Sequence, residues 1–143
     1  MRLDERSARD RFARARTVRL ATVDAGGHPH LVPITFAVLA AGAAVVFAVD
    51  HKPKTTTRLR RLDNLRANPA VALLADEWSE DWTQLWWVRA DGTGQVLPDD
   101  DPGRGAAVAA LVERYEQYRE RPPAGPVVRI AVDRWSGWSG AAP

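Results

Sequence analysis

The chain of 143 residues contains no cysteine, which excludes disulfide bonds, thiol chemistry and any metal site built from cysteine. Its three histidines, His28, His30 and His51, lack the spacing of metal ligands, so we expect no bound metal. The sequence also lacks a Gly-x-Ser-x-Gly elbow, a Gly-x-x-x-x-Gly-Lys loop and a Gly-x-Gly-x-x-Gly fingerprint. Side chains alone therefore indicate neither covalent nor acid–base catalysis, and any reaction would depend on a bound cofactor.

The chain also has little net charge. The formal charge is +2 although the sequence pI is about 9.5. The basic excess is local, because residues 52–66 carry two lysines and four arginines against one acid, Asp63. The segment Met1–Arg6 is too charged to be a signal peptide, so we expect a cytoplasmic protein. Length and an ordinary composition predict a single globular domain over residues 1–143.

A run of nineteen residues, 31–49, contains no charged side chain and would be long enough for a transmembrane helix. However, Pro33 lies near its start, residues 40–43 interrupt its middle, and β-branched or aromatic residues alternate on either side. This pattern favours two buried strands joined by a tight turn over a membrane span.

Residue patterns along the rest of the chain predict a mainly β fold. We expect helices over residues 4–15, 57–67 and 104–120, and strands over residues 17–23, 30–39, 44–49, 70–76, 84–89, 95–97 and 127–133. Glycines mark a turn at residues 24–27 and a kink or bulge at Gly92 and Gly94. Because the strands succeed one another without regular crossover helices, they predict a small antiparallel barrel.

The predicted strand over residues 30–39 has two different faces. Its even positions, Val32, Ile34, Phe36 and Val38, are bulky and apolar, so they should face a core. Its odd positions are mostly smaller, and Pro33, which has no N–H, belongs at a strand edge or a bulge. We therefore expect this strand to bury one face and to offer the other to another molecule.

The segment Asp50–Thr57 joins an apolar strand to the helix that contains Arg58–Leu62. Its threonines can cap the helix, whose first four N–H groups have no internal partner. Those N–H groups, the helix dipole, Lys52, Lys54 and the following arginines together favour a multiply charged anion. A solvated basic turn is the alternative, because charged runs often simply face water. The strand-to-helix context favours a phosphate-binding corner.

Tryptophan is unusually frequent, with six residues at positions 78, 82, 86, 87, 135 and 138. A tryptophan-rich core or a dimer contact would explain most of them. Because Trp86 and Trp87 are adjacent in a predicted strand, they point to opposite faces, and one must face away from the core. That residue is a candidate for a subunit interface or for stacking on a flat ring.

The order of several motifs resembles a known family. These motifs are Thr22-x-Asp24, Pro33-Ile34-Thr35-Phe36, Lys52-x-Lys54, Arg58-Leu59-Arg60-Arg61-Leu62, Asn64-Leu65-x-x-Asn68-Pro69, Glu80-Asp81-Trp82 and Leu85-Trp86-Trp87-Val88-Arg89. Over residues 5–138 the chain resembles the split β-barrel flavin and deazaflavin oxidoreductases related to pyridoxamine 5′-phosphate oxidase. It is most similar to their actinobacterial subgroup, which uses coenzyme F420, an 8-hydroxy-5-deazaflavin.

This resemblance implies a six-stranded antiparallel split β-barrel with a few flanking helices, and a homodimer with cofactors in grooves at the subunit interface. It also implies hydride transfer from reduced F420 to a small organic substrate, with no identified proton donor. The cofactor-binding residues that it implies are Pro33, Ile34, Thr35 and Phe36 along the ring, Lys52, Lys54, Thr55 and Thr56 at the phosphate, Arg58 and Arg61 near the acidic tail, and Trp82, Trp87 and Trp138 from the second subunit.

Three alternatives to this function stay open. The same fold could use FMN as an oxidase or reductase. It could bind a cofactor, haem or another tetrapyrrole without turnover. Nucleic-acid binding through residues 52–66 is disfavoured, because the net charge is close to zero and no aromatic side chains alternate with those arginines.

Overall fold

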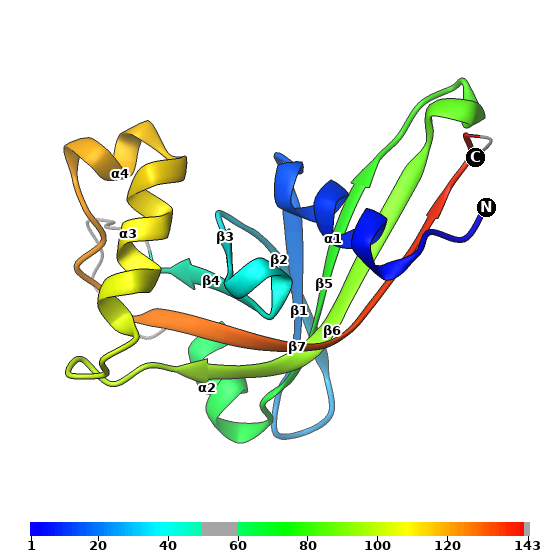
Figure 1. Ribbon diagram of the computed structural model, residues 1–143. Helices are drawn as coiled ribbons and strands as arrows, with labels where there is room; N and C mark the ends of the chain where they lie inside the picture. The colour runs from blue at the N-terminus through cyan, green and yellow to red at the C-terminus, as the bar shows by residue number, and fades with distance from the viewer. Residues whose placement is uncertain (50–59, 142–143) are drawn as a thin grey trace.

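A computed structural model describes residues 1–49 and 60–141 as a strongly curved antiparallel sheet flanked by helices (Figure 1). The strands are β1 (Val18–Val23), β2 (Pro29–Ile34), β3 (Ala37–Leu39), β4 (Ala44–Ala48), β5 (Ala70–Glu77), β6 (Trp86–Val96) and β7 (Val127–Ser139). The helices are α1 (Glu5–Arg14), α2 (Arg60–Ala67), α3 (Arg104–Arg114) and α4 (Glu116–Glu120), with short 3-10 turns at Ala40–Gly42 and Trp82–Gln84. The order across the sheet is β2-β1-β5-β6-β7-β4-β3.

The two edge strands of this sheet, β2 and β3, are consecutive in the chain and are separated only by Thr35 and Phe36. Ile34 pairs with Val18 of β1, whereas Ala37 pairs with Val46 of β4. The predicted single strand over residues 30–39 is therefore wrong at Thr35 and Phe36, because the backbone must leave one ladder there and join another. Counted as one bent strand, β2 and β3 complete the six-stranded split barrel that the family resemblance implies.

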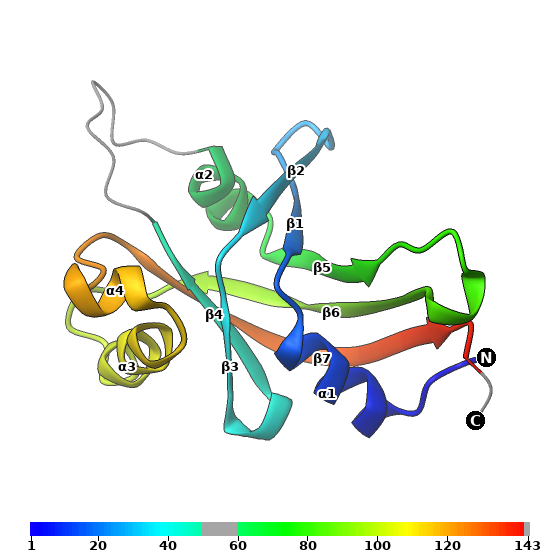
Figure 2. The ribbon, with the colours of Figure 1, turned by 90° about the horizontal axis from the view of Figure 1, so that it is seen from above.

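The hydrophobic core has two parts, one on each side of β4. Inside the barrel, Phe12 of α1 packs edge-to-face on Phe36 and Trp135, with ring centroids 5.2 and 5.0 Å apart. Outside it, Leu111 of α3 and Tyr118 of α4 cover the other face of β3 and β4. Figure 2 shows α3 and α4 beside β3 and β4. The alternating residues of β4 are buried on both faces for this reason.

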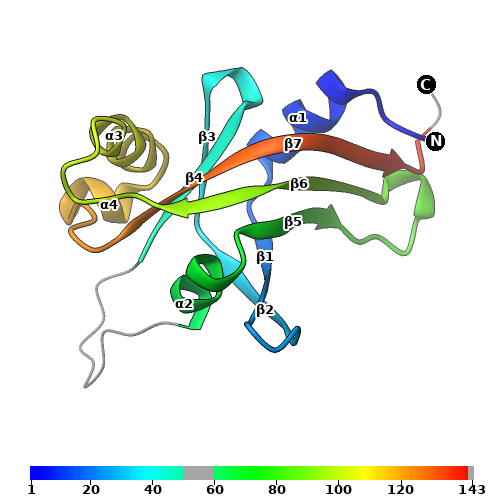
Figure 3. The same ribbon diagram turned by 90° about the horizontal axis from the view of Figure 1, so that it is seen from below.

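Strands β6 and β7 are longer than the sequence predicts, and they run side by side along most of the sheet (Figure 3). Residues 134–139, which lie beyond the expected end of the last strand at residue 133, continue β7, and Trp138 pairs with Trp87. The expected irregularity is a register shift between Asp91 and Gly92 in an otherwise continuous β6. A Cβ atom on Gly92 would lie 2.2 Å from the carbonyl oxygen of Ala131, so the close approach of β6 and β7 requires glycine there.

The predicted helix over residues 104–120 is two helices that meet at Tyr115. Tyr115 has φ −117° and ψ 122°, an extended conformation that interrupts the helix. Its hydroxyl accepts a hydrogen bond from the backbone N–H of Phe36 at 3.0 Å. The spacing of apolar residues in this segment predicts a continuous helix, because it carries no information about the contact with Phe36.

No helix in the described parts of the chain is long and apolar enough to cross a membrane. The uncharged run forms strands, with Ala40–Gly42 as the predicted turn between β3 and β4.

Candidate functional site

A cavity of about 340 Å³ opens where β2 bends, and we call it the strand-end cavity. Its lining residues come from the segment before β1, the end of β2 and the residue after it, the end of β4, and α2, namely Arg16, Thr17, Pro33, Ile34, Thr35, Ala48 and Arg61. Pro33 is exposed and belongs to the outward face of β2, which the residue parity of the sequence predicts to be offered. The cavity thus combines an exposed strand edge with two guanidinium groups.

The structure brings together four of the cofactor-binding residues expected from the sequence, Pro33, Ile34, Thr35 and Arg61. Phe36 does not join them, because its side chain lies fully buried in the barrel and its N–H donates to Tyr115. Five others, Lys52, Lys54, Thr55, Thr56 and Arg58, lie outside the described residues. The residues on both sides of that basic segment, Ala48 and Arg61, line the cavity.

Hydrogen bonds from α3 and α4 hold the bent strand that forms the cavity. Tyr115 accepts the N–H of Phe36, and the hydroxyls of Tyr118 and Thr35 lie 3.0 Å apart. The guanidinium of Arg114 lies 4.3 Å from the ring centroid of Phe36, within range of a cation–π contact. Arg114 also donates to the carbonyl oxygens of Ala13 and Ala15 at the end of α1, at 2.6 and 2.5 Å. One short helical segment therefore joins β2 and β3 to the residues that precede β1.

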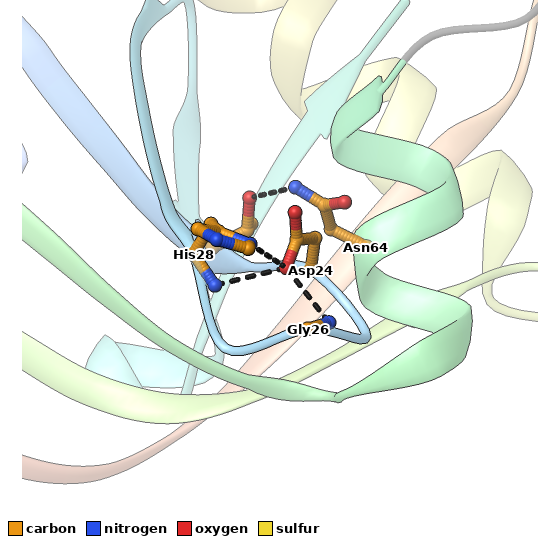
Figure 4. Close-up of polar contacts among 5 residues, drawn as sticks. Asp24, Gly26, His28 and Asn64 are labelled. Carbon is orange, nitrogen blue, oxygen red and sulfur yellow. Dashed lines mark hydrogen bonds and ion pairs between the residues drawn. The ribbon is translucent and has the colours of Figure 1, made fainter.

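At the opposite end of β2, the carboxylate of Asp24 organises the β1–β2 turn (Figure 4). It accepts the backbone N–H groups of Gly26 and His28, each at 2.9 Å. The hydrogen bond from the His28 N–H is the main cause that lowers the pKa of Asp24 below its ordinary value of 3.8. Close by, the buried amide of Asn64 in α2 donates to the Thr22 hydroxyl at 3.0 Å, which connects α2 to β1.

The tryptophans occupy three different environments. Trp135 is buried, and its Nε1 donates to the carbonyl oxygen of Gly42 at 3.1 Å. Trp86 packs against the barrel core, so its neighbour Trp87 is the one that faces away, where it pairs with Trp138. Trp82 is 70% exposed and Trp138 is 37% exposed. None of Trp82, Trp87 and Trp138 lines the strand-end cavity of this chain.

A larger pocket of about 680 Å³ adjoins the end of α1, and we call it the arginine pocket. It is lined by Arg11, Arg14, Ala15, Arg16, Thr17, Asp76, Glu77 and Trp86. Sequence reasoning missed it, because arginines on the polar face of an amphipathic helix are ordinary. The available signal was the repetition of arginine at positions 11, 14 and 16 across the junction between a helix and a strand.

No group of three or more histidine, aspartate and glutamate side chains in residues 1–49 and 60–141 could hold a metal ion.

Comparison with known proteins agrees with this fold. The family model for pyridoxamine 5′-phosphate oxidase matches residues 5–139. An FAD-binding protein from Mesorhizobium loti superposes with a TM-score of 0.74 at 21% identity, covering 96% of this chain and 95% of its own. An FAD-binding protein from Mycobacterium smegmatis gives 0.65 at 22% identity, with 96% and 97% covered. The haem storage protein HutZ from Vibrio cholerae gives 0.69 at 18% identity, with 93% and 89% covered. No curated protein matches the chain.

Proposed function

The chain belongs to the pyridoxamine 5′-phosphate oxidase family, and we propose that it is an oxidoreductase that uses a deazaflavin, coenzyme F420, or alternatively FMN. The observation that carries this proposal is the strand-end cavity, which Pro33 and Ile34 of β2 line together with Arg61 of α2. The flavin-binding neighbours support a ring cofactor of this kind. The choice of F420 over FMN rests on the basic residues of this chain alone.

The described residues of the cavity suit a cofactor that has a tricyclic ring and a phosphate group. The edge of β2 at Pro33 and Thr35 offers a strip of backbone along which a flat ring can lie. Arg16 and Arg61 supply positive charge, and a guanidinium binds phosphate or carboxylate oxygens through paired hydrogen bonds. Arg60 continues the basic helix beyond the cavity, and the longer acidic tail of F420 needs such a continuation.

When bound, the reduced deazaflavin supplies a hydride from C5. The protein's contribution is to orient the two reactants, to exclude water and to maintain a positive field. Because Tyr115 and Tyr118 hold the bend of β2 and β3, the strip that contacts the ring is fixed before the cofactor arrives. No described side chain in the cavity is an evident proton donor, so we assign that step to solvent.

We further propose a two-fold homodimer with the cofactor at the subunit interface. Leu31 on the outward face of β2 is 66% exposed, and Trp82 and Trp138 also expose large apolar area. An isologous contact is the commonest way to cover such surface. Sedimentation at micromolar concentration should show a dimer, and a monomer there would contradict the proposal.

A tetrapyrrole carrier is the second candidate, because HutZ, which has a similar fold, is a haem storage protein. Among the described residues that line the strand-end cavity there is no histidine, methionine or tyrosine to serve as an axial ligand. We therefore favour the flavin-type cofactor.

The decisive experiment titrates the apo-protein separately with F420, FMN and haem at the same moderate salt concentration. We expect F420 to bind most tightly, FMN more weakly, and haem without the absorbance change of an axially ligated iron. Tighter binding of FMN would overturn the deazaflavin assignment and leave a flavin enzyme. Tight haem binding with neither flavin bound would overturn the oxidoreductase.

A further inference from the structure

The arginine pocket carries an excess of unneutralised positive charge. Its two acids are both engaged, since Asp76 accepts from Arg19 at 2.8 Å and Glu77 accepts from Nε1 of Trp86 at 3.1 Å. Within the described parts of the chain, Arg11, Arg14 and Arg16 form no ion pair. Three arginines thus line the pocket with only one carboxylate that is not in an ion pair, that of Glu77, so the pocket keeps a net positive charge.

The carbonyl groups of α1 would ordinarily weaken an anion site at this end of the helix, because a helix C-terminus carries partial negative charge. Here Arg114 donates to the carbonyl oxygens of Ala13 and Ala15. These two carbonyl groups would otherwise repel an anion beside Ala15. They are already hydrogen bonded to the positively charged guanidinium of Arg114.

The pocket also has a flat aromatic wall. Trp86 is half-buried against the barrel core, and its hydrogen bond to Glu77 restrains the indole. The guanidinium of Arg11 lies 5.6 Å from the centroid of the Trp86 ring, within range of a cation–π contact. A conjugated organic group can therefore lie against Trp86 while its charged end reaches the arginines.

The arginine pocket and the strand-end cavity meet at Arg16 and Thr17, which line both. The sheet register explains this arrangement. Val18 pairs with Ile34 on one side and with Ala75 on the other, so Thr17 lies at the end of β1 between β2 and β5. A molecule in the arginine pocket therefore lies next to whatever occupies the strand-end cavity.

From these four observations we propose that the arginine pocket binds the carboxylate, sulfonate or phosphate group of the enzyme's organic substrate. The conjugated part of the substrate then extends past Arg16 and Thr17 toward the cofactor. This proposal rests on the proposed function, because it assigns the strand-end cavity to the cofactor ring. It predicts that neutral analogues of a substrate bind poorly and that the acidic tail of F420 does not occupy the arginine pocket.

The test uses 4-nitrobenzoate and its uncharged methyl ester as a matched pair of probes, measured by equilibrium dialysis against the full chain. We expect the anion to bind about tenfold tighter than the ester, the factor that corresponds to roughly 1.4 kcal/mol. The double variant Arg11→Gln with Arg14→Gln should remove this preference, because both residues line the arginine pocket and neither lines the strand-end cavity. Arg6→Gln with Arg121→Gln makes the same charge change at exposed positions outside the pocket and should preserve it.

A second arm repeats the dialysis with saturating F420, or with saturating FMN if only FMN binds. Unchanged affinity for 4-nitrobenzoate supports a substrate site beside the cofactor, whereas competition shows that the cofactor's own anion occupies the pocket and overturns the proposal. Equal binding of the anion and the ester, or equal affinity in both double variants, also overturns it. The failure of both cofactors to bind is seen in the separate titration and overturns the oxidoreductase, whatever the probes show.

Discussion

The hydroxyl of Tyr115 accepts the backbone N–H of Phe36 at 3.0 Å across 79 residues of sequence. This hydrogen bond occurs where the chain passes from β2 to β3 and where Tyr115 itself interrupts a helix. The break between β2 and β3 and the interruption of the helix at Tyr115 thus meet at this one hydrogen bond. Because Thr35 at the same bend lines the strand-end cavity, the contact couples fold stability to the shape of the proposed cofactor site.

Tyr115→Phe should destabilise the protein by about 1–2 kcal/mol, since the Phe36 N–H loses its acceptor while the aromatic ring is kept. The ring contact with Tyr118, at 5.7 Å between centroids, should survive. Urea unfolding measures the change in stability, and cofactor titration should show weaker binding in the variant. An unchanged unfolding midpoint would show that water replaces the hydroxyl without loss.

Arg61→Ala should weaken cofactor binding by about 1.5–3 kcal/mol, the scale of a hydrogen bond to a charged group. The control is Arg66→Ala on the same helix, because Arg66 lines a different cavity beside Leu97. Calorimetric titration of both variants with F420 and FMN should show a larger loss for F420 at Arg61. Since the site is partly open, the effect should also shrink as salt rises. Equal losses at Arg61 and Arg66 would indicate a general effect of charge.

Gly92→Ala should destabilise the protein by about 2 kcal/mol or more, because the added Cβ would collide with the backbone carbonyl of Ala131 at 2.2 Å. Gly105→Ala is the matched control, since nothing lies within 4 Å of its Cβ position and it lies in α3. That control should raise stability by about 0.5–1 kcal/mol, the usual difference between glycine and alanine in a helix. Thermal and urea unfolding of both variants check the signs, and a neutral Gly92→Ala would mean that β6 and β7 can separate there.

The turn at Asp24 should contribute stability that depends on pH. Its pKa is lowered in the folded chain, chiefly by the N–H of His28, so the carboxylate stabilises the fold above pH 3.8. That contribution should be lost as the pH falls below 3.8 and through the lower pKa of the folded state. Urea midpoints of Asp24→Asn should therefore fall less steeply with acid than those of the parent protein. Asp100→Asn, at an exposed aspartate, is the control and should follow the parent.

The helices and strands that depend on nearby residues in the chain were predictable from the sequence. The helix near residues 5–14, the strands on either side of the Asp24 turn and the β3–β4 hairpin depend on periodicity and turn residues, and all are present. The bulge at Gly92 was predictable for the same reason, because glycine marks a close approach of backbones. The parity of residues 30–39 also identified the exposed face of β2, on which Leu31 and Pro33 lie.

The predictions that failed concern segments whose conformation is set by a distant partner. The last strand was predicted to end at residue 133, because the strand character of residues 134–139 appears only when β6 pairs with them. The helix over residues 104–120 was predicted to be continuous. Nothing near Tyr115 in the sequence indicates that its hydroxyl accepts a hydrogen bond from the distant N–H of Phe36.

For the candidate site, the sequence alone determined which residue types were available, namely a cluster of basic residues after β4 and a strand with one free face. The tertiary structure decided which of them meet. It joined Arg16 to Arg61 at one cavity and gathered the arginines of α1 around Trp86 at another. The reason is that a ladder register or a helix position fixes neighbours that are far apart along the chain. Local propensity and spacing describe only neighbours within a few residues.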